Sequence, residues 1–189
     1  GRAYWNHTGL GAYPGDWERT ARELSEAGFN MVLPNMLWAG LAHYASDLLP
    51  RSASFEKYGD QIEQCVAACH KHGIEVHVWK VNFNLSTAPR AFVEQMRSAG
   101  RTQVTRQGEP TNWLCPSHPE NQKLERDTML EVVKKYAVDG IHFDYIRYPD
   151  GDNCYCDGCR QRFEKEMGIR VDHWPEDCYS GRLKESYRN

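Results

Sequence analysis

Short apolar segments alternate along this chain with longer segments in which apolar residues recur every three or four positions. The short segments lie at residues 3–5, 30–35, 76–81 and 140–146. Such short apolar runs predict buried strands, whereas the longer period predicts helices that pack by one face. The pattern therefore predicts an α/β protein in which four strands form a parallel sheet.

Capping residues mark the ends of the helices expected between these strands. Asp16 and Asp60 are suitable N-cap residues, Pro89 suits a first helical turn, and Ser117 with Glu120 forms a capping box. Glycine follows the first three helices and can adopt the left-handed conformation common after a helix end. The helices are therefore expected at residues 17–27, 61–72, 90–99 and 118–136.

The number of repeating units sets the expected fold class. Four βα units amount to half of a (β/α)8 barrel, and a complete barrel typically needs roughly 250 residues, whereas this chain has 189. Residues 101–114, with Gln107-Gly108 at their centre, predict an inserted β-hairpin. No glycine-rich phosphate-binding motif follows any strand, which disfavours a nucleotide-binding open sheet. We therefore expect a TIM-barrel-like half barrel at residues 1–149 with a Cys-rich extension of the same domain at residues 150–189.

The strand at residues 140–146 carries two polar side chains, His142 and Asp144, in a segment that should be apolar. They are two positions apart, so they lie on one face of the strand. Because barrel chemistry takes place at the C-terminal ends of strands, Asp144 is a candidate catalytic carboxylate. Arg147 could keep Asp144 ionised or bind a hydroxyl-rich ligand. The alternative is that Asp144 merely caps the turn after the strand.

Three cysteines close together predict a metal site. Cys154, Cys156 and Cys159 form a C-x-C-x-x-C motif whose spacing hinders disulfides between its members but suits convergence on one ion. Thiolates favour zinc or an iron–sulfur cluster, and a closed four-cysteine zinc site is structural. From the residues alone, either Cys115 or Cys178 could be the fourth ligand.

The remaining cysteines bear on the alternative of a disulfide framework. Cys65 and Cys69 fall on the apolar stripe of the helix at residues 61–72, so we expect them to be core thiols. An extracellular disulfide framework is the alternative to zinc, but the total of seven cysteines is odd.

Composition and charge exclude some classes of partner. The formal net charge is −3 with both signs interspersed, so there is no basic surface for nucleic acid and no polybasic membrane patch. No apolar run approaches the roughly 18 residues of a transmembrane helix, and no signal peptide is recognisable. The cellular location is left open, because an exported chain can have lost its signal.

Three segments together resemble the glycosyl-hydrolase-like family 10 proteins. They are residues 73–79, residues 113–120 and residues 140–149, of which the F-D-Y-I-R-Y-P stretch is the most specific. The resemblance implies a (β/α)8 barrel that acts on glycans, some relatives acting on bacterial cell-wall polysaccharide, with Asp144 at the position of the proposed catalytic carboxylate. The C-x-C-x-x-C motif is similar to the four-cysteine zinc site of family-42 β-galactosidases, which implies Cys115 as the fourth ligand. Unlike both families, the chain lacks strands five to eight.

Glycoside hydrolysis normally uses two carboxyl groups, and this chain offers one convincing candidate, Asp144. Asp47, Asp150 and Asp152 lie in loops and are more typical of solvated turn residues. The candidate substrate-binding residues are polar or aromatic and lie at or just beyond strand ends. They are Asn35, Trp38, Lys80, Asn82, His142, Arg147 and Tyr148.

The sequence is also compatible with two other functions. One is a carbohydrate-binding half barrel without catalysis, and the other is a zinc-stabilised protein-interaction module. A half barrel also leaves strand edges and apolar residues such as Leu33, Val78 and Ile146 without an opposite wall. We therefore expect either a missing C-terminal half of the barrel or association with a second copy.

Overall fold

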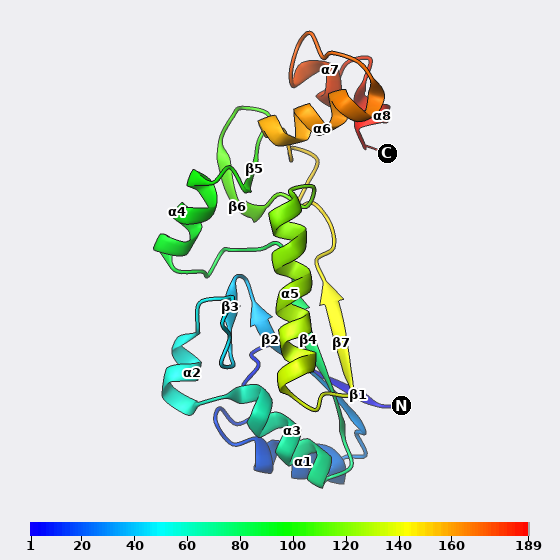
Figure 1. Ribbon diagram of the computed structural model, residues 1–189. Coiled ribbons are helices and arrows are strands. Elements are labelled where there is room, and N and C mark those ends of the chain that lie inside the picture. The colour runs from blue at the N-terminus through cyan, green and yellow to red at the C-terminus, as the bar shows by residue number, and fades with distance from the viewer. Residues whose placement is uncertain (189) are drawn as a thin grey trace. The chain divides into compact units, whose positions relative to one another are not determined.

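The computed structural model describes residues 1–188 (Figure 1). The chain forms two compact units, which are described separately below. The first contains Gly1–Pro89 and Lys123–Ile146, and the second contains Arg90–Gln122 and the chain from Arg147 onward. The second unit thus takes in residues 90–122 as well as the extension expected from residue 150. The reason is that residues 90–122 include Cys115, whose thiol lies among those of the extension.

A parallel sheet forms the centre of the first unit, in the order β1-β2-β4-β7. Its strands are β1 (Ala3–Asn6), β2 (Met31–Trp38), β4 (Glu75–Val81) and β7 (Gly140–Asp144). All three pairings between neighbours are parallel, which confirms the four predicted strands and their class. The short strand β3 (Leu41–Ala42), which the sequence pattern did not indicate, pairs antiparallel with β2.

The helices of the first unit largely follow the predicted caps. They are α1 (Trp17–Glu26), α2 (Ala53–Tyr58), α3 (Gln61–Lys71) and α5 (Pro119–Lys135), whose first turn belongs to the second unit. The Asp16 and Asp60 side chains accept backbone N–H groups at the starts of α1 and α3. Helix α2 was not predicted. Its N-cap is Ser52.

The predicted capping box at the start of α5 is wrong. His118 directly precedes the helix, and its carbonyl accepts the N–H of Asn121. The His118 ring nitrogen Nδ1 accepts the N–H of Glu120, which Ser117 was expected to bind. The Ser117 hydroxyl lies instead beside two thiols, because the cysteine cluster forms next to it.

The two faces of β7 have different surroundings. Ile141 and Phe143 line an apolar groove together with Met129 and other residues of α5. His142 and Asp144 point to the opposite face, as the alternation predicted. That second face is the one on which the candidate site lies.

The three apolar residues that were expected to be uncovered differ in their exposure to solvent. Leu33 and Val78 are buried, with 7% and 0% exposure, so the expectation for these two residues is wrong. Val78 is adjacent to Trp79 and therefore points to the opposite face, which the helices cover. Ile146, just beyond β7, is 64% exposed as expected. Within residues 1–188, no helix has the length and apolar character required to cross a bilayer.

The second unit is built from short elements. They are α4 (Arg90–Ser98), the hairpin β5 (Thr102–Val104) and β6 (Pro110–Leu114), α6 (Asp157–Met167), α7 (Glu176–Tyr179) and α8 (Lys184–Arg188). The antiparallel β5–β6 pair confirms the predicted hairpin. One small core packs Tyr155, Phe163, Val171 and Cys178 together, and a separate one contains the other four cysteines of this unit.

Candidate active site and metal centre

Asp144 is the last residue of β7, and two donors hold its carboxylate. The indole Nε1 of Trp79 donates to Oδ2 over 3.1 Å, and the backbone N–H of Tyr145 donates to Oδ1 over 2.7 Å. Because Trp79 lies on the neighbouring strand β4, the parallel pairing itself brings the indole to the carboxylate. The side chain of Asp144 is therefore fixed in orientation while the residue is only half-buried.

Aromatic rings surround this carboxylate on the same face of the sheet. The Trp79 ring lies 5.1 Å from that of Trp5 and 4.8 Å from that of His7. The His142 ring lies 4.8 Å from Trp5, whose side chain is 43% exposed. From the sequence, His7 and Trp79 are expected to be core or loop residues, and Trp5 is not among the predicted site residues although it lies near the end of the first strand.

Strained backbone conformations occur at the C-terminal ends of the strands, where Asp144 also lies. Among residues 1–188, the non-glycine residues with positive φ are Ala39 at 48°, Phe83 at 62° and Tyr145 at 59°. Ala39 follows β2, Phe83 lies two residues beyond β4, and Tyr145 follows β7. Left-handed backbone costs energy for residues with a side chain and tends to cluster at functional sites. The C-terminal edge of the sheet is therefore the strained edge of the first unit.

Two buried asparagines at this edge have polar atoms without partners. Asn35 is fully buried in β2, and neither its amide oxygen nor its amide nitrogen has a hydrogen-bond partner. Asn82, just after β4, donates through Nδ2 to the main-chain oxygen of Asp144 over 2.7 Å, while its Oδ1 has no partner. Unsatisfied buried amides are rare because they are costly.

The other predicted binding residues are not all at this edge. Lys80 is buried and forms an ion pair with Glu125 of α5, 3.2 Å from Nζ to Oε2, which places it on the helix side of the sheet. Trp38 is half-buried at the end of β2. Arg147 and Tyr148 belong to the second unit.

The loop carboxylates considered as second acids have other surroundings. Asp47 forms an ion pair with Lys135 over 2.8 Å. Asp150, in the second unit, accepts the backbone N–H of Asp152 and the amide of Asn153. Each of these contacts is typical of a surface ion pair or a turn.

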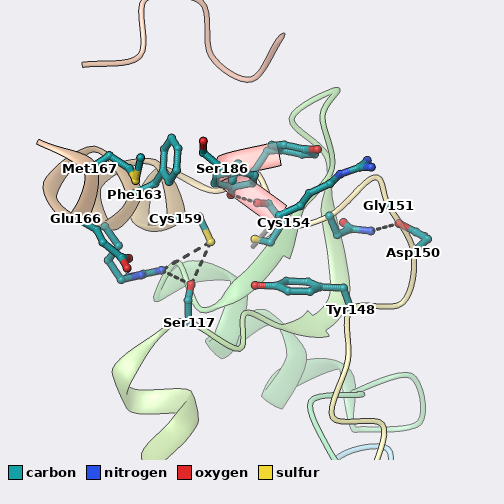
Figure 2. Close-up of a pocket in the computed structure, with 15 residues that line it drawn as sticks. Ser117, Tyr148, Asp150, Gly151, Cys154, Cys159, Phe163, Glu166, Met167 and Ser186 are labelled. Atoms are coloured by element: carbon teal, nitrogen blue, oxygen red, sulfur yellow. Dashed lines mark hydrogen bonds between the residues drawn. The ribbon is translucent and has the colours of Figure 1, made fainter. Parts of the chain in front are cut away.

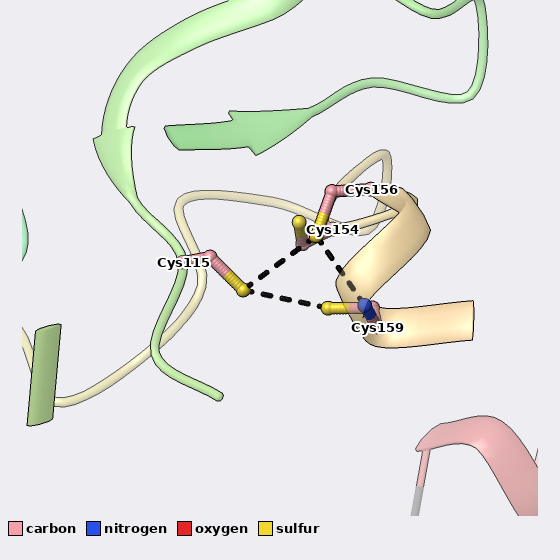
Figure 3. A group of neighbouring side chains, drawn as sticks. All are labelled: Cys115, Cys154, Cys156 and Cys159. Carbon is pink, nitrogen blue, oxygen red and sulfur yellow. Dashed lines mark hydrogen bonds between the residues drawn. The ribbon is translucent and has the colours of Figure 1, made fainter. Parts of the chain in front are cut away.

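Four thiols converge in the second unit (Figure 3). The sulfur atoms of Cys115, Cys154, Cys156 and Cys159 all lie within 4.8 Å of one another, and all four residues are buried. The Cys115 sulfur is 3.4 Å from that of Cys159 and 3.9 Å from that of Cys156. A tetrahedral zinc ion with bonds of about 2.3 Å requires sulfur atoms about 3.8 Å apart, so the four residues fit a metal ion. All seven cysteines are free in the structure.

Polar groups next to the cluster favour thiolates. The Ser117 hydroxyl lies 3.1 Å from the Cys159 sulfur, and Arg162 donates to that hydroxyl over 2.9 Å. Hydrogen bonds within the cluster lower the pKa of Cys115 and Cys159 and raise the pKa of Cys154 and Cys156, so the first two thiols are the ones that favour the thiolate form. Thiolates are the form that binds metal.

The other cysteines lie apart from this group. Cys178 packs in the neighbouring small core with Tyr155 and Phe163. Cys65 and Cys69 are fully buried in α3, which confirms them as core thiols, and burial raises the pKa of Cys65 well above its ordinary value.

Solved glycoside hydrolases define the class of this fold. α-L-Fucosidase isoenzyme 2 from Paenibacillus thiaminolyticus matches with a TM-score of 0.66 at 16% identity, covering 98% of this chain and 29% of that one. The PgaB (BpsB) glycoside hydrolase domain from Bordetella bronchiseptica matches with a TM-score of 0.65 at 14% identity, covering 98% and 55%. The chain thus has a partial TIM-barrel-like glycoside hydrolase fold.

The family is shown by the sequence match. Residues 16–170 match the Glycosyl hydrolase-like 10 family, and the chain belongs to it. Glycosyl hydrolase DigH of Escherichia coli strain K12 is 29% identical in an alignment of 149 residues that covers 67% of this chain and 33% of that protein. This chain therefore spans about a third of the length of that relative.

Proposed function

We propose that this chain carries a catalytic carboxylate, Asp144, of a glycoside hydrolase that cleaves a polysaccharide. One observation carries the proposal. Asp144 is held by two hydrogen-bond donors at the C-terminal end of a barrel-type strand, beside exposed aromatic surface. In barrel enzymes this end of the strands holds the chemistry.

The neighbouring residues have distinct roles in this proposal. Trp79 and the N–H of Tyr145 orient the carboxylate, which is one of the two carboxyl groups that glycoside hydrolysis normally uses. The exposed ring of Trp5 offers a face on which a sugar ring can stack. Asn82 is fully buried and supports the site by donating through Nδ2 to the main-chain oxygen of Asp144.

The substitution Asp144→Asn tests the proposal. We expect it to lower the release of reducing sugar by at least about 100-fold, because the amide cannot transfer a proton or act as a nucleophile. The substrates are purified bacterial cell-wall sacculi and a panel of soluble polysaccharides. The matched control is Asp172→Asn, since that side chain is 64% exposed in the second unit.

Two outcomes separate this enzyme from a carbohydrate-binding half barrel. Hydrolysis at the wild-type rate by the Asp144→Asn variant, with its fold intact by circular dichroism, would rule out Asp144 as a catalytic residue. Retention of a polysaccharide by the wild-type protein with no product from any member of the panel would favour binding without catalysis.

We also propose that the four-cysteine cluster binds one structural zinc ion. The support is the closed arrangement of four buried sulfur atoms with no position left for a substrate. Elemental analysis of the purified protein should find one zinc per chain, and Cys115→Ser should lower that value while the core change Cys65→Ser leaves it unchanged. A metal-free wild-type protein, or disulfides mapped among the four cysteines, would contradict the proposal.

A further inference from the structure

A cavity of about 450 Å³ lies within the second unit, and the proposed hydrolysis does not use it (Figure 2). Its walls come from Ser117, from the loop at residues 148–155, and from helices α6 and α8. In Figure 2, Tyr148 and Asp150 lie along one side of the cavity, and Phe163 and Glu166 of α6 lie along the other. Pockets that hold small organic ligands typically enclose about 300–1,000 Å³, so the size suits a mono- or disaccharide unit.

Two polar atoms in residues that line this cavity are buried and without partners. Asn153 donates through Nδ2 to Asp150 over 2.8 Å, whereas its amide oxygen Oδ1 accepts from no donor. Arg162 donates through Nη2 to Ser117 over 2.9 Å, and its Nε has no acceptor. Residues that line the cavity therefore carry one acceptor and one donor without a partner, and a buried group of either kind is costly until it is satisfied.

The remaining lining indicates the class of ligand. The aromatic residues Tyr148, Phe163 and Tyr187 contribute apolar surface. Two acidic residues, Asp150 and Glu166, are balanced by two arginines. They are Arg162 and Arg188. Aromatic surface with mixed donors, acceptors and balanced charge suits a neutral ligand with apolar faces and many hydroxyl groups, which is the chemistry of a sugar ring.

We propose that this cavity is a saccharide-binding site in the second unit, additional to the site at Asp144. A sugar hydroxyl donates to the Asn153 amide oxygen, another accepts from Arg162 Nε, and the ring packs against Tyr148. The inference rests on the proposed function in taking a glycan as the ligand. It does not require Asp144 to be catalytic, because binding in the cavity involves no bond cleavage.

Titration of the ¹⁵N-labelled protein with soluble oligosaccharides tests the site. The probes are cellotetraose, maltotetraose and N-acetylated chitotetraose, with tetragalacturonate as an anionic comparison. We expect at least one neutral probe to shift the amide signals of Gly151, Asn153 and Glu166, and the affinity to change little when salt is added. The indole N–H signal of Trp79, which binds Asp144, reports separately on the other site.

Variants connect the signal shifts to the cavity. Asn153→Ala should weaken binding about tenfold, the effect of one lost hydrogen bond to a ligand. Tyr148→Ala should weaken it as well and serves as the second variant if Asn153→Ala disturbs the loop. Lys165→Ala is the matched control, because Lys165 lies next to Glu166 on α6 but is exposed outside the cavity.

The outcomes distinguish this inference from the proposed function. Shifts of Gly151 and Glu166 that survive both cavity variants unchanged would overturn the inference, as would no shift with any neutral probe at its solubility limit. Preference for tetragalacturonate with steep salt dependence would overturn the neutral class of ligand. Failure of Asp144→Asn to abolish hydrolysis would refute the catalytic assignment alone and leave the cavity result intact.

Discussion

At the residue scale, the orientation of the Asp144 carboxylate depends on two donors, the indole nitrogen of Trp79 and the backbone N–H of Tyr145. The indole is 4% exposed and lies within the aromatic group of Trp5, His7 and His142. The backbone N–H of Tyr145 donates to the other carboxylate oxygen over 2.7 Å. Of these two donors, only the indole of Trp79 can be removed by replacing a side chain.

Trp79→Phe removes the indole donor while keeping an aromatic ring in the group. We expect kcat on any polysaccharide of the panel that the wild-type protein hydrolyses to fall about tenfold to 100-fold, because a hydrogen bond to a charged group is lost. Trp5→Phe is the matched control, since no hydrogen bond links Trp5 to Asp144, and it should alter KM more than kcat. An unchanged kcat in a folded Trp79→Phe variant would contradict the positioning role.

His43 should make the stability of the first unit depend on pH. Its ring is buried, its Nδ1 lies 3.0 Å from the Ser52 hydroxyl, and burial lowers its pKa from 6.5 to about 4. As pH falls below 6.5, the unfolded chain binds a proton that the folded chain does not bind until about pH 4. The stabilisation is complete above pH 6.5, and about 3 kcal/mol is lost as the pH falls to 4.

Urea unfolding at pH 7 and pH 4.5 measures this effect. His43→Gln should remove this contribution to the pH dependence of the free energy of unfolding, because glutamine does not titrate. His173→Gln, at a side chain that is 81% exposed, should leave that contribution in place. Equal pH dependence in the wild-type protein and the His43→Gln variant would show that another group is responsible.

At the scale of elements, the cysteine cluster connects three parts of the second unit. Cys115 follows strand β6, Cys154 lies in the loop before α6, and Cys159 is in the first turn of α6. The N–H of Tyr155 also bonds the main-chain oxygen of Val104 in β5. A metal ion on the four thiols would therefore hold the hairpin and α6 together.

Removal of the metal should destabilise the second unit more than the first. We expect a strong chelator to increase hydrogen exchange in residues 102–115 and 154–167, because short elements with a small core depend on such a link. Strands β2 and β4 should exchange as before. Hydrogen–deuterium exchange with mass spectrometry measures both regions, and equal protection with and without chelator would exclude a structural role for the metal.

At the scale of the whole molecule, the uncovered apolar surface of the first unit is the main feature. Leu130 and Val133 of α5 are 41% and 45% exposed, and Phe143 and Ile146 are 46% and 64% exposed. These residues line one groove of about 250 Å³ with little polar surface. Contiguous exposed apolar surface is typical of association sites.

We expect the protein to associate with a second copy through this groove. Light scattering should give a mass above that of one 21.9 kDa chain, and the double substitution Phe143→Ser with Ile146→Ser should shift the mass towards that of one chain. Leu48→Ser is a control, because Leu48 is 40% exposed but does not line the groove. A wild-type protein that stays monomeric at high concentration would contradict this expectation.

The sequence by itself determined the α/β class, the parallel strands, most helix starts and the local part of the cysteine motif. These features depend on contacts between residues close in the chain, such as Asp16 with the N–H of Arg19 and Asp60 with the N–H of Ile62. The prediction from the sequence was wrong at Ser117, because its hydroxyl lies beside the thiol of Cys159 instead of capping α5.

Only the tertiary structure decided which distant residues meet. It brought Trp79 to Asp144 and Lys80 to Glu125, and the periodicity of one strand cannot reveal what the next strand or helix presents. It also placed Cys115, the fourth ligand that the family resemblance implies, beside the thiols of the extension, whereas Cys178 packs in another small core. The physical reason is that strand pairing and helix packing join residues far apart in the chain, such as Trp79 and Asp144 with a separation of 65 positions, where local propensity carries no information.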